Sequence, residues 1–339
     1  FVSENNSVPD SGKIRDPLTK KLRRNKFAFD LKVSKFDGHT RAFLKIEDGC
    51  DIFCSYCIIP YVRGKVTSKK IDDILFEAEQ LVSNGYKEIV LTGIHLGAYG
   101  KETGYQLSII DVLEELQSLQ GLERIRLSSI EVNEVTDRLI DIVADSDKVC
   151  PHFHLPLQSG DDYILKRMNR KYNVAQYLKT LEKIKKKMEL PSITTDIMVG
   201  FPGENRDHFE NTLRLCEQAG FSKTHIFPYS PREDTPAAKM SDHCKSSEIK
   251  ARKKELESLT TETSLRYKNS FIGMDSSILV ENRRDKKTGK LCGYSDRYMK
   301  VLFDGPDDLM NEIVDVHVES VLPQYALGKC GSHAERGNK

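Results

Sequence analysis

Three cysteines lie within eight consecutive residues near the start of the sequence, in the run GCDIFCSYCIIPYVRG over residues 49–64. Cys50, Cys54 and Cys57 offer three thiolates with no fourth cysteine close by. A closed zinc site takes four protein ligands, so zinc would need a histidine from another strand. The candidates for that ligand are His39, His95 and His154. A four-iron cluster held by three cysteines instead leaves one iron open for a substrate or cofactor, and the number three favours this alternative.

Six short apolar, β-branched runs alternate with segments of helical spacing in the first two thirds of the chain. The runs are RAFLKI (41–46), EIVLTG (88–93), RIRLSSI (124–130), HFHLPL (152–157), ITTDIMVGF (193–201) and THIFPY (224–229). Several of the intervening segments stop at a glycine, such as Gly85, Gly121 and Gly220, as helix ends often do. Six strand–helix repeats in about two hundred residues predict an α/β fold with a parallel sheet, either open or curled into a partial barrel.

The segments that follow the predicted strands are rich in glycine, serine, polar or thiol groups. They are DGCDIFCSYC, LTGIHLGAYG, SSIEVNE, PLQSGDD and VGFPGE. In parallel sheets the ligand binds at the carboxyl ends of the strands. We therefore expect these five segments to converge on one pocket that includes the cysteines.

The pattern changes after a charged helix expected near residues 246–265. The runs SSILVEN, LCGYSDRYMKVLFDG and EIVDVHVESVLPQYALGK alternate with period two, which predicts a small all-β barrel of about 60 residues. The predicted division is a linker or arm at 1–38, an α/β core at 39–265, the barrel at 266–328 and a disordered tail at 329–339.

Tyr56 precedes the last cysteine, and with this aromatic residue the run resembles the CxxxCxΦC signature of the radical S-adenosylmethionine (SAM) superfamily. The resemblance implies a partial (βα)6 barrel with the cysteine loop after the first strand. It also implies that Cys50, Cys54 and Cys57 are catalytic and hold a [4Fe–4S] cluster, whose open iron binds the amino and carboxylate groups of SAM. One electron then cleaves SAM to a 5′-deoxyadenosyl radical, so the cofactor carries the chemistry while the protein positions and shields it.

The same resemblance implies which strand ends hold SAM. LTGIHLG maps near the methionyl amino group, the segment that begins at Ser128 maps to the ribose or methionyl part, and DIMVGFPGE maps to the adenine. The implied cofactor-binding residues are Tyr56, Thr92, Gly93, Ser129, Glu131, Val199, Gly200 and Gly203. Taken singly, each glycine is also what a tight turn between a strand and a helix requires.

Pro60, Arg63 and Gly64 form a Pro-x-x-Arg-Gly run that is similar to the methylthiotransferases of this superfamily, which insert a methylthio group at an unactivated C–H bond. The segments HLPLQSGDDYILKRMNRKY and PYSPREDTPA also look like that family, and the C-terminal barrel resembles its TRAM domain. LTGIHLGAYG with CIIPYVRG is most similar to the branch that modifies carbon 2 of N6-threonylcarbamoyladenosine in tRNA, just 3′ of the anticodon. The resemblance covers residues 39–328.

Two alternatives stay open. A sibling branch of the family modifies an aspartate of a ribosomal protein, and a non-enzymatic alternative is a zinc-stabilised RNA-binding protein. Family members also carry an N-terminal domain with three further cysteines for a second [4Fe–4S] cluster, which is linked to sulfur delivery. Residues 1–38 contain no cysteine. The resemblance therefore implies a chain that binds and cleaves SAM, with the second cluster expected only in a preceding domain.

Basic residues crowd the first hairpin of the predicted barrel. The predicted RNA-binding residues are Arg283, Arg284, Lys286, Lys287, Lys290 and Arg297. Cations contact phosphates without reading sequence, while Tyr294 and Tyr298 nearby could stack on splayed bases. A soluble hairpin tip would explain the charges alone. Arg167, Arg170 and Lys171 could hold a phosphate or the cofactor carboxylate, or be exposed residues at a helix start.

The composition suits an ordinary soluble chain, with a net charge of +1 and no window near the roughly 20 apolar residues of a membrane span. Residues 1–45 hold eleven Lys and Arg against five Asp and Glu, and residues 250–300 hold thirteen against seven. This excess at both ends suits a polyanion. The implied partners are the anticodon stem-loop of tRNA, a low-potential electron donor such as flavodoxin or ferredoxin, and a sulfur source, in the cytoplasm and without a membrane.

Overall fold

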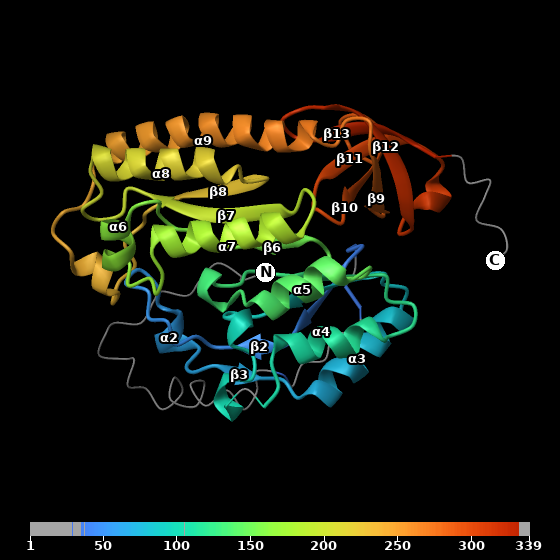
Figure 1. The fold of residues 1–339 in the computed structure, drawn as a ribbon, viewed down its shortest axis with the longest axis horizontal. Coiled ribbons are helices and arrows are strands. Elements are labelled where there is room, and N and C mark those ends of the chain that lie inside the picture. Colours follow the sequence, from blue (N-terminus) through green and yellow to red (C-terminus); the bar gives the residue numbers. More distant parts are fainter. Residues whose placement is uncertain (1–28, 30–34, 37, 105, 332–339) are drawn as a thin grey trace.

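The computed structural model describes residues 29, 35–36, 38–104 and 106–331 (Figure 1). The predicted arm at 1–38 lies almost wholly outside these residues, as does the tail beyond residue 331. An α/β core occupies the left and centre of Figure 1 and a β-barrel the upper right, and the long helix α9 (Ser246–Asn269) runs from one to the other.

Six parallel strands form the core sheet in the order of the chain. They are β1 (Ala42–Lys45), β4 (Glu88–Thr92), β5 (Arg124–Leu127), β6 (His152–His154), β7 (Ser192–Val199) and β8 (Lys223–Pro228). β1, β4 and β5 pair with one another, as do β6, β7 and β8, and parallel bridges at Ile125–Val149 and Ser129–His154 connect the two groups. Each strand begins within one residue of its predicted run. The predicted partial (βα)6 barrel is confirmed.

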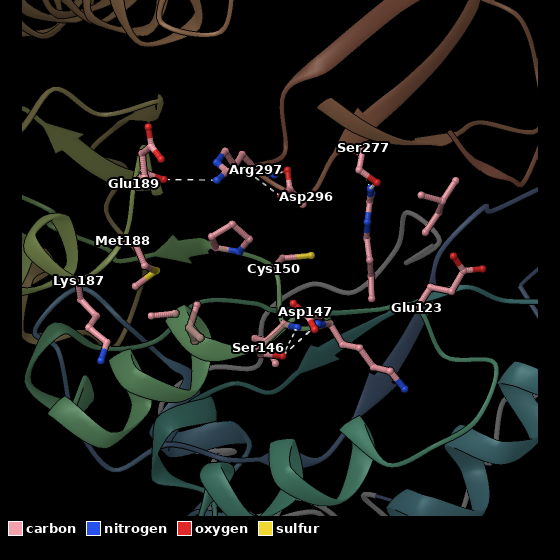
Figure 2. A pocket seen from close by; sticks show the side chains of 17 residues that line it. Glu123, Ser146, Asp147, Cys150, Lys187, Met188, Glu189, Ser277, Asp296 and Arg297 are labelled. Carbon is pink, nitrogen blue, oxygen red and sulfur yellow. Dashed lines mark hydrogen bonds and ion pairs between the residues drawn. The ribbon is translucent and has the colours of Figure 1, made fainter. Parts of the chain in front are cut away.

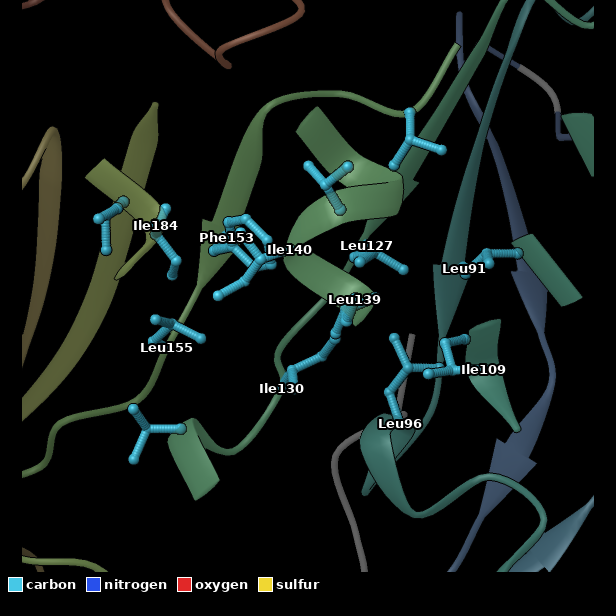
Figure 3. Close-up of a cluster of buried hydrophobic side chains, with 14 of the residues drawn as sticks. Leu91, Leu96, Ile109, Leu127, Ile130, Leu139, Ile140, Phe153, Leu155 and Ile184 are labelled. Carbon is cyan, nitrogen blue, oxygen red and sulfur yellow. The ribbon is translucent and has the colours of Figure 1, made fainter. Parts of the chain in front are cut away.

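Helices follow the strands and cover the outer face of the sheet. They are α3 (Ile71–Ser83), α4 (Ile109–Gln117), α5 (Asp137–Asp145), α6 (Asp162–Arg167), α7 (Val174–Lys187) and α8 (Arg206–Ala219). Their apolar faces meet the sheet in one core, where Leu91 and Phe153 of the strands lie among Ile109 and Ile140 of the helices (Figure 3). Fully burying such a side chain stabilises the fold by about 1.5–3 kcal/mol.

Local sequence signals set the helix ends. Ser108, Asn173 and Asn205 form capping boxes at the starts of α4, α7 and α8, so their side chains accept hydrogen bonds from otherwise unpaired N–H groups. α8 ends at Gly220, whose φ of 61° is the left-handed conformation that helix C-termini favour. These capping residues fix where the helices begin and end, and therefore where the chain turns toward the next strand.

The C-terminal domain is a closed five-stranded barrel. Its strands are β9 (Asp275–Val280), β10 (Leu291–Ser295), β11 (Lys300–Asp304), β12 (Ile313–Val321) and β13 (Ala326–Cys330), paired in the order β10-β11-β13-β12-β9. Period-two alternation buries one face of each strand, for example Ile278, Val301 and Val316. The predicted small barrel is confirmed, and β13 takes in Lys329 and Cys330, which the sequence analysis assigned to the tail.

A buried carboxylate lies where the core meets the barrel. Glu88, the first residue of β4, is 0% exposed and is surrounded by three arginines. Arg126 Nε donates a hydrogen bond to Glu88 Oε1 at 2.8 Å, and guanidinium nitrogens of Arg41 and Arg124 lie 3.6 Å from the carboxylate oxygens. Burial alone would raise the pKa of Glu88, but the arginines, Arg126 above all, hold it below its ordinary value.

The same arginines bind the barrel to the amino ends of the strands. Arg126 Nη1 donates to the backbone carbonyl of Asp296 at 2.7 Å, and Arg124 Nη2 donates to the carbonyl of Ser277 at 2.6 Å. The barrel therefore docks at the end of the sheet opposite the cysteine loop, which lies beside α2 (Ile59–Val62) at the left of Figure 1.

Tyr294 and Tyr298 take part in this docking, a contact that their predicted role as base-stacking residues did not include. The Arg41 guanidinium lies 4.7 Å from the centre of the Tyr294 ring, and that of Arg126 lies 4.6 Å from the Tyr298 ring. Tyr298 also packs against the ring of His152 at 5.4 Å. Cation–π contacts with arginines place both rings beside the core, and Tyr298 keeps 39% of its surface exposed.

Replacement of Glu88 by Gln should therefore destabilise the chain strongly. E88Q removes the carboxylate that lies within 3.6 Å of Arg41, Arg124 and Arg126, of which, among the described residues, Arg41 alone also pairs with Glu281. Leaving buried charges uncompensated costs about 3–5 kcal/mol, so the free energy of unfolding in urea at neutral pH should fall by about that amount. Because the folded-state pKa of Glu88 is below 4.5, this stabilisation is present above that pH and is lost as the pH falls through the lowered value.

The matched control is E114Q. Glu114 pairs with Arg138 at 2.8 Å on the surface, with side chains 47% and 61% exposed, so its loss should cost far less stability than the loss of Glu88. The difference in stability between wild type and E88Q should also shrink as the pH is lowered from 7 toward 3. A difference that stays constant over this pH range, or equals that of E114Q, would contradict the role given to Glu88.

Candidate active site

The three cysteines lie on one loop after β1, at the carboxyl end of the sheet. The short elements around the loop are β2 (Glu47–Asp48), α2 (Ile59–Val62) and β3 (Thr67–Ser68). The Cys50 N–H donates to the carbonyl of Gly64 at 3.0 Å and so closes the loop. Cys54 is buried, whereas Cys50 and Cys57 are partly exposed. Burial raises the pKa of the Cys57 thiol, and its neighbours Cys54 and Cys50 raise it further, so the three thiols interact with one another.

Residues that follow β6, more than a hundred positions later in the chain, hold the loop in place. The Ser55 N–H donates to the carbonyl of Met168 at 2.9 Å, and its Oγ donates to the carbonyl of Arg167 at 2.8 Å. Asn169 Nδ2 donates to the carbonyl of Phe53 at 2.7 Å. The segment just after α6 therefore fixes the backbone on which the thiols are mounted.

Arg170 joins the cysteine loop to the third strand end. Its Nη1 lies 3.2 Å from Cys54 Sγ, and its Nη2 forms an ion pair with Glu131. Nε donates to the Tyr172 hydroxyl at 3.1 Å, so the guanidinium is held on three sides. Burial raises the pKa of the Cys54 thiol, and the positive charge of Arg170 opposes that rise. The guanidinium thus supports negative charge on the buried sulfur.

The second strand end contributes a buried carboxylate. A side chain at Gly93, which follows Thr92 at the end of β4, would come within 2.7 Å of Glu47 Oε2, so glycine leaves room for this carboxylate. The same oxygen accepts a hydrogen bond from the His95 N–H at 2.7 Å. Burial raises the pKa of Glu47 to about 7. His95 Nε2 in turn lies 2.5 Å from Glu134 Oε1.

The fifth strand end is a tight turn packed on later segments. Val199, fully buried, ends β7, and Gly200 follows with a φ of 76°. A side chain at Gly200 would meet Ile249 of α9 at 2.3 Å, so both conformation and space require glycine there. The Gly203 N–H donates to the carbonyl of Asp242 at 2.8 Å. Packing and backbone conformation therefore account for these glycines. Their backbone lies at the carboxyl edge of the sheet.

The two remaining predicted cofactor residues also lie at strand ends. The Tyr56 ring packs edge-on against Phe201, which follows β7, with centroids 6.3 Å apart. Ser129 follows β5, forms a parallel bridge with His154 and lines a cavity inside the curved sheet. The predicted site residues therefore gather at one edge of the sheet, as the βα rhythm predicts.

Comparison with known proteins agrees with this geometry. Residues 44–216 match the family model of the radical SAM superfamily. The threonylcarbamoyladenosine tRNA methylthiotransferase MtaB of Bacillus subtilis (strain 168) is 39% identical over 88% of this chain and 67% of its own length, and the MtaB of Chlamydia pneumoniae is 37% identical over 94% and 75%. The tRNA-2-methylthio-N(6)-dimethylallyladenosine synthase of Carboxydothermus hydrogenoformans is 36% identical over 95% and 77%. The chain belongs to the radical SAM methylthiotransferases.

The chain covers a different share of the length of each relative. It spans between 56% and 77% of the length of the curated relatives it matches. Relatives with the two different substrate names are equally similar, with one of each name at 39% identity and one of each at 40%. The family assignment confirms the resemblance and brings with it a [4Fe–4S] cluster and SAM as cofactors.

The residues at the carboxyl edge fit these two cofactors. The donor set is three thiols on one loop, and the Arg170 guanidinium lies against the buried Cys54. Glu47 Oε1 and Glu134 Oε2 are buried and have no hydrogen-bond partner among the described residues. Buried carboxylate oxygens without a partner are costly, and an ammonium group such as the methionyl amine of SAM would satisfy them.

The zinc alternative receives no support. In the described part of the chain, no group of three or more His, Cys, Asp and Glu side chains is arranged to hold one metal ion. A single zinc ion needs all its sulfur ligands about 2.3 Å from one point. The thiols of a four-iron cluster bind different irons, so they need not meet at one centre. Of the candidate fourth ligands, His39 is exposed and His154 is hydrogen-bonded to Thr194 inside the sheet. His95 lies beside Cys50, and its Nε2 is 2.5 Å from Glu134 Oε1.

The predicted RNA-binding residues fall into two groups. Arg283, Lys286 and Lys287 are exposed, and no described residue forms an ion pair with their side chains. Three others are committed within the protein: Arg284 pairs with Asp307, Lys290 pairs with Asp304, and Arg297 pairs with Asp296. Only the first group is available to a phosphate without breaking a contact.

Arg297 lies at a hollow of about 540 Å³ between the core and the barrel (Figure 2). Its Nε donates to the carbonyl of Leu190 at 3.0 Å, and Figure 2 shows the guanidinium turned between Glu189 and Asp296. This hollow is at the amino end of the sheet, near Cys150, and contains none of the three cysteines of the loop. It belongs to the domain junction.

Sequence reasoning missed the groups that support the cysteine loop. Arg170 was expected to hold a phosphate or the cofactor carboxylate, or to be exposed at a helix start, and Asn169 was not singled out. Nothing local connects either residue to cysteines so far away in the chain. The sequence does contain a partial signal for the residues that line the interior of the sheet. Lys223, just before a predicted strand, and His225 within it are two positions apart, which puts both polar side chains on one face of β8.

The Arg170–Glu131 pair can be tested by a double-mutant cycle without any cofactor. R170M leaves the partly buried Glu131 carboxylate unpaired and should lower the free energy of unfolding by about 3 kcal/mol. E131Q should cost a similar amount, and the double variant should cost less than the sum by at least about 1 kcal/mol, measured by urea unfolding. The neighbouring exposed Lys171, changed to Met, should move stability by no more than about 0.5 kcal/mol. Strict additivity of R170M and E131Q would show that the pair does not act as one unit.

Proposed function

We propose that this chain carries the radical SAM site of a transferase that adds a methylthio group to carbon 2 of N6-threonylcarbamoyladenosine in tRNA, just 3′ of the anticodon. One observation supports this most. Cys54, on the loop that also carries Cys50 and Cys57, contacts the Arg170–Glu131 pair at the carboxyl edge of the sheet, in a chain similar to proteins named as tRNA methylthiotransferases.

Different residues of the chain position the cluster and the separate parts of SAM. When bound, the cluster and SAM supply a radical that removes hydrogen from an unactivated C–H bond. The three cysteines hold the cluster, and Arg170 offsets the negative charge at the most buried of them. Glu47 presents a buried carboxylate to the methionyl amine, next to the backbone of Thr92 and Gly93. The turn at Gly200 and Gly203 flanks the adenine.

A second candidate is the same reaction on N6-dimethylallyladenosine. Relatives with that name match this chain at the same 39% identity as the relative named for threonylcarbamoyladenosine. The cysteine loop serves both reactions equally, so the choice between the substrates depends on what lines the interior of the sheet.

The partners follow from the reaction. The anticodon stem-loop of tRNA is the polyanion that Arg283, Lys286 and Lys287 would contact. Reduction of the cluster requires a low-potential donor such as a flavodoxin or ferredoxin, and the product requires a sulfur source. None of the described helices is long and apolar enough to cross a membrane. We place the reaction in the cytoplasm, where tRNA and such donors are found.

Replacement of Cys50, Cys54 or Cys57 by Ala tests the cofactor site. The wild-type chain, reconstituted anaerobically with iron and sulfide, should be brown and should release 5′-deoxyadenosine from SAM with dithionite. Each variant should lose both properties, by more than the roughly 10–100-fold that loss of a group supporting a metal ligand costs. C330A, at a partly exposed cysteine of the barrel, should keep both. Persistence of colour and release in all three loop variants would refute the assignment.

The substrate is tested by nucleoside mass spectrometry of tRNA from cells lacking the full-length gene. The 2-methylthio form of threonylcarbamoyladenosine should disappear and unmodified threonylcarbamoyladenosine should accumulate. Loss of the 2-methylthio form of dimethylallyladenosine instead would favour the second candidate. A normal tRNA profile together with an unmodified ribosomal-protein aspartate would move the chain to the sibling branch.

A further inference from the structure

A cavity of about 230 Å³ lies inside the curved sheet, below the carboxyl edge. Its wall residues come from β4, β5, β6, β7 and β8, and Tyr298 of the barrel forms part of it. The polar lining residues are Arg126, Ser128, Ser129, His152, His154, Thr194, Lys223, His225 and Tyr298. The volume is below the roughly 300–1,000 Å³ of pockets for drug-sized ligands, so it suits a substituent rather than a whole nucleotide.

Residues that line the cavity lie close in the sequence to a residue of the cysteine site. Ser128 and Ser129 line it, and two residues later Glu131 pairs with Arg170, which touches Cys54. The cavity therefore extends from Ser129, which follows β5, to Tyr298 of the barrel at the amino ends of the strands. A nucleoside held at the carboxyl edge would have its substituents within reach of the interior.

Two buried polar atoms in the cavity have no partner among the described residues. They are Ser128 Oγ and His152 Nδ1. The opposite nitrogen of His152 is hydrogen-bonded to Thr194 Oγ1 at 3.1 Å, which fixes the ring. A buried polar group without a partner costs about 1–3 kcal/mol. Both groups are therefore suited to a ligand that brings its own hydrogen-bonding atoms.

One cation of the cavity has no partner among the described residues, whereas Arg126 is held by Glu88. No described residue pairs with the ammonium group of Lys223 at the start of β8. Burial lowers the pKa of His225, and the charge of Lys223 lowers it further. Burial likewise lowers the pKa of His152, with Arg126 as the second cause. Asp196, which lies 3.2 Å from His154 Nε2, is the carboxylate that faces these groups. A ligand with a negative charge would be attracted here.

We propose that this cavity binds the threonylcarbamoyl substituent of the target adenosine, with Lys223 and His225 receiving its carboxylate and Ser128 and His152 its hydroxyl or amide groups. The proposal rests on the function proposed above and chooses between its two candidate substrates. Threonylcarbamoyl carries a carboxylate, a hydroxyl and amide groups, whereas dimethylallyl carries none of these. A site with buried hydrogen-bonding groups rejects an analogue that leaves them unpaired.

The walls are compatible with this assignment. Apart from the polar atoms, the cavity is bounded by Val90, Leu127 and the faces of the histidine and tyrosine rings. Ligand pockets commonly combine such apolar walls with a few polar groups that fix orientation. The methyl group of a threonyl moiety can lie against these walls while its polar atoms reach Lys223 and Ser128.

The test compares the binding of three anticodon stem-loop RNAs that carry threonylcarbamoyl-, dimethylallyl- or unmodified adenosine. Dissociation constants are measured by fluorescence anisotropy for wild type, K223M, H225F and K250M. Wild type should bind the threonylcarbamoyl RNA at least about tenfold more tightly than the other two. K223M and H225F should each lose about tenfold of that preference, because a charge-assisted hydrogen bond is lost, while binding of unmodified RNA stays constant. K250M, at an exposed lysine of α9, should match wild type.

Three outcomes overturn the proposal. Wild type could fail to prefer threonylcarbamoyl RNA, it could prefer the dimethylallyl RNA, or K223M could weaken all three RNAs equally, as loss of a phosphate contact would. The methylthio product is measured separately by mass spectrometry with the full-length protein. Selective binding without any methylthio product would refute the proposed function and leave the pocket standing. A methylthio product formed with equal efficiency on both modified RNAs would refute the proposed role of the pocket and leave the methylthiotransferase function standing.

Discussion

One buried carboxylate holds the two domains of this chain in register. Glu88 is fully enclosed at the amino end of β4, and the guanidinium groups of Arg41, Arg124 and Arg126 surround it. Two of these arginines also donate to backbone carbonyls of the barrel. A charge buried this deeply is tolerated only when all partners stay in place, so the amino ends of the strands and the barrel must move as one body. The cavity floor formed by Tyr298 depends on this docking.

The two ends of the same strands therefore serve different purposes. Their amino ends are joined to the barrel by charge and by cation–π contacts, while their carboxyl ends expose thiols, carboxylates and backbone to ligands. Arg170 shows how the carboxyl end is organised, because one guanidinium touches Cys54, Glu131 and Tyr172. Arginine suits this position since its planar fork can satisfy several partners without losing its charge.

The sequence was most informative where the signal is local. Every core strand begins within one residue of its predicted run, because alternating βα patterns and glycine stops act over a few residues. The cysteine spacing likewise identified the loop that the structure places at the carboxyl edge. Interactions between distant segments were beyond local pattern: Cys54 and Arg170 are separated by 116 positions, and Arg126 and Asp296 by 170. The contact of Tyr298 with Arg126 was not predicted for the same reason, since a tyrosine among basic residues looks the same whether it meets a base or a buried arginine.

The sheet has two edges that do not meet. In the described part of the chain β1 and β8 form no pair, whereas a complete eight-stranded barrel encloses a packed interior. Phe43 on β1 and Phe227 on β8 are 40% and 50% exposed, so aromatic rings stand on both unpaired edges. The backbone edges of β1 and β8 therefore stay unpaired within the described residues, which a closed barrel does not allow.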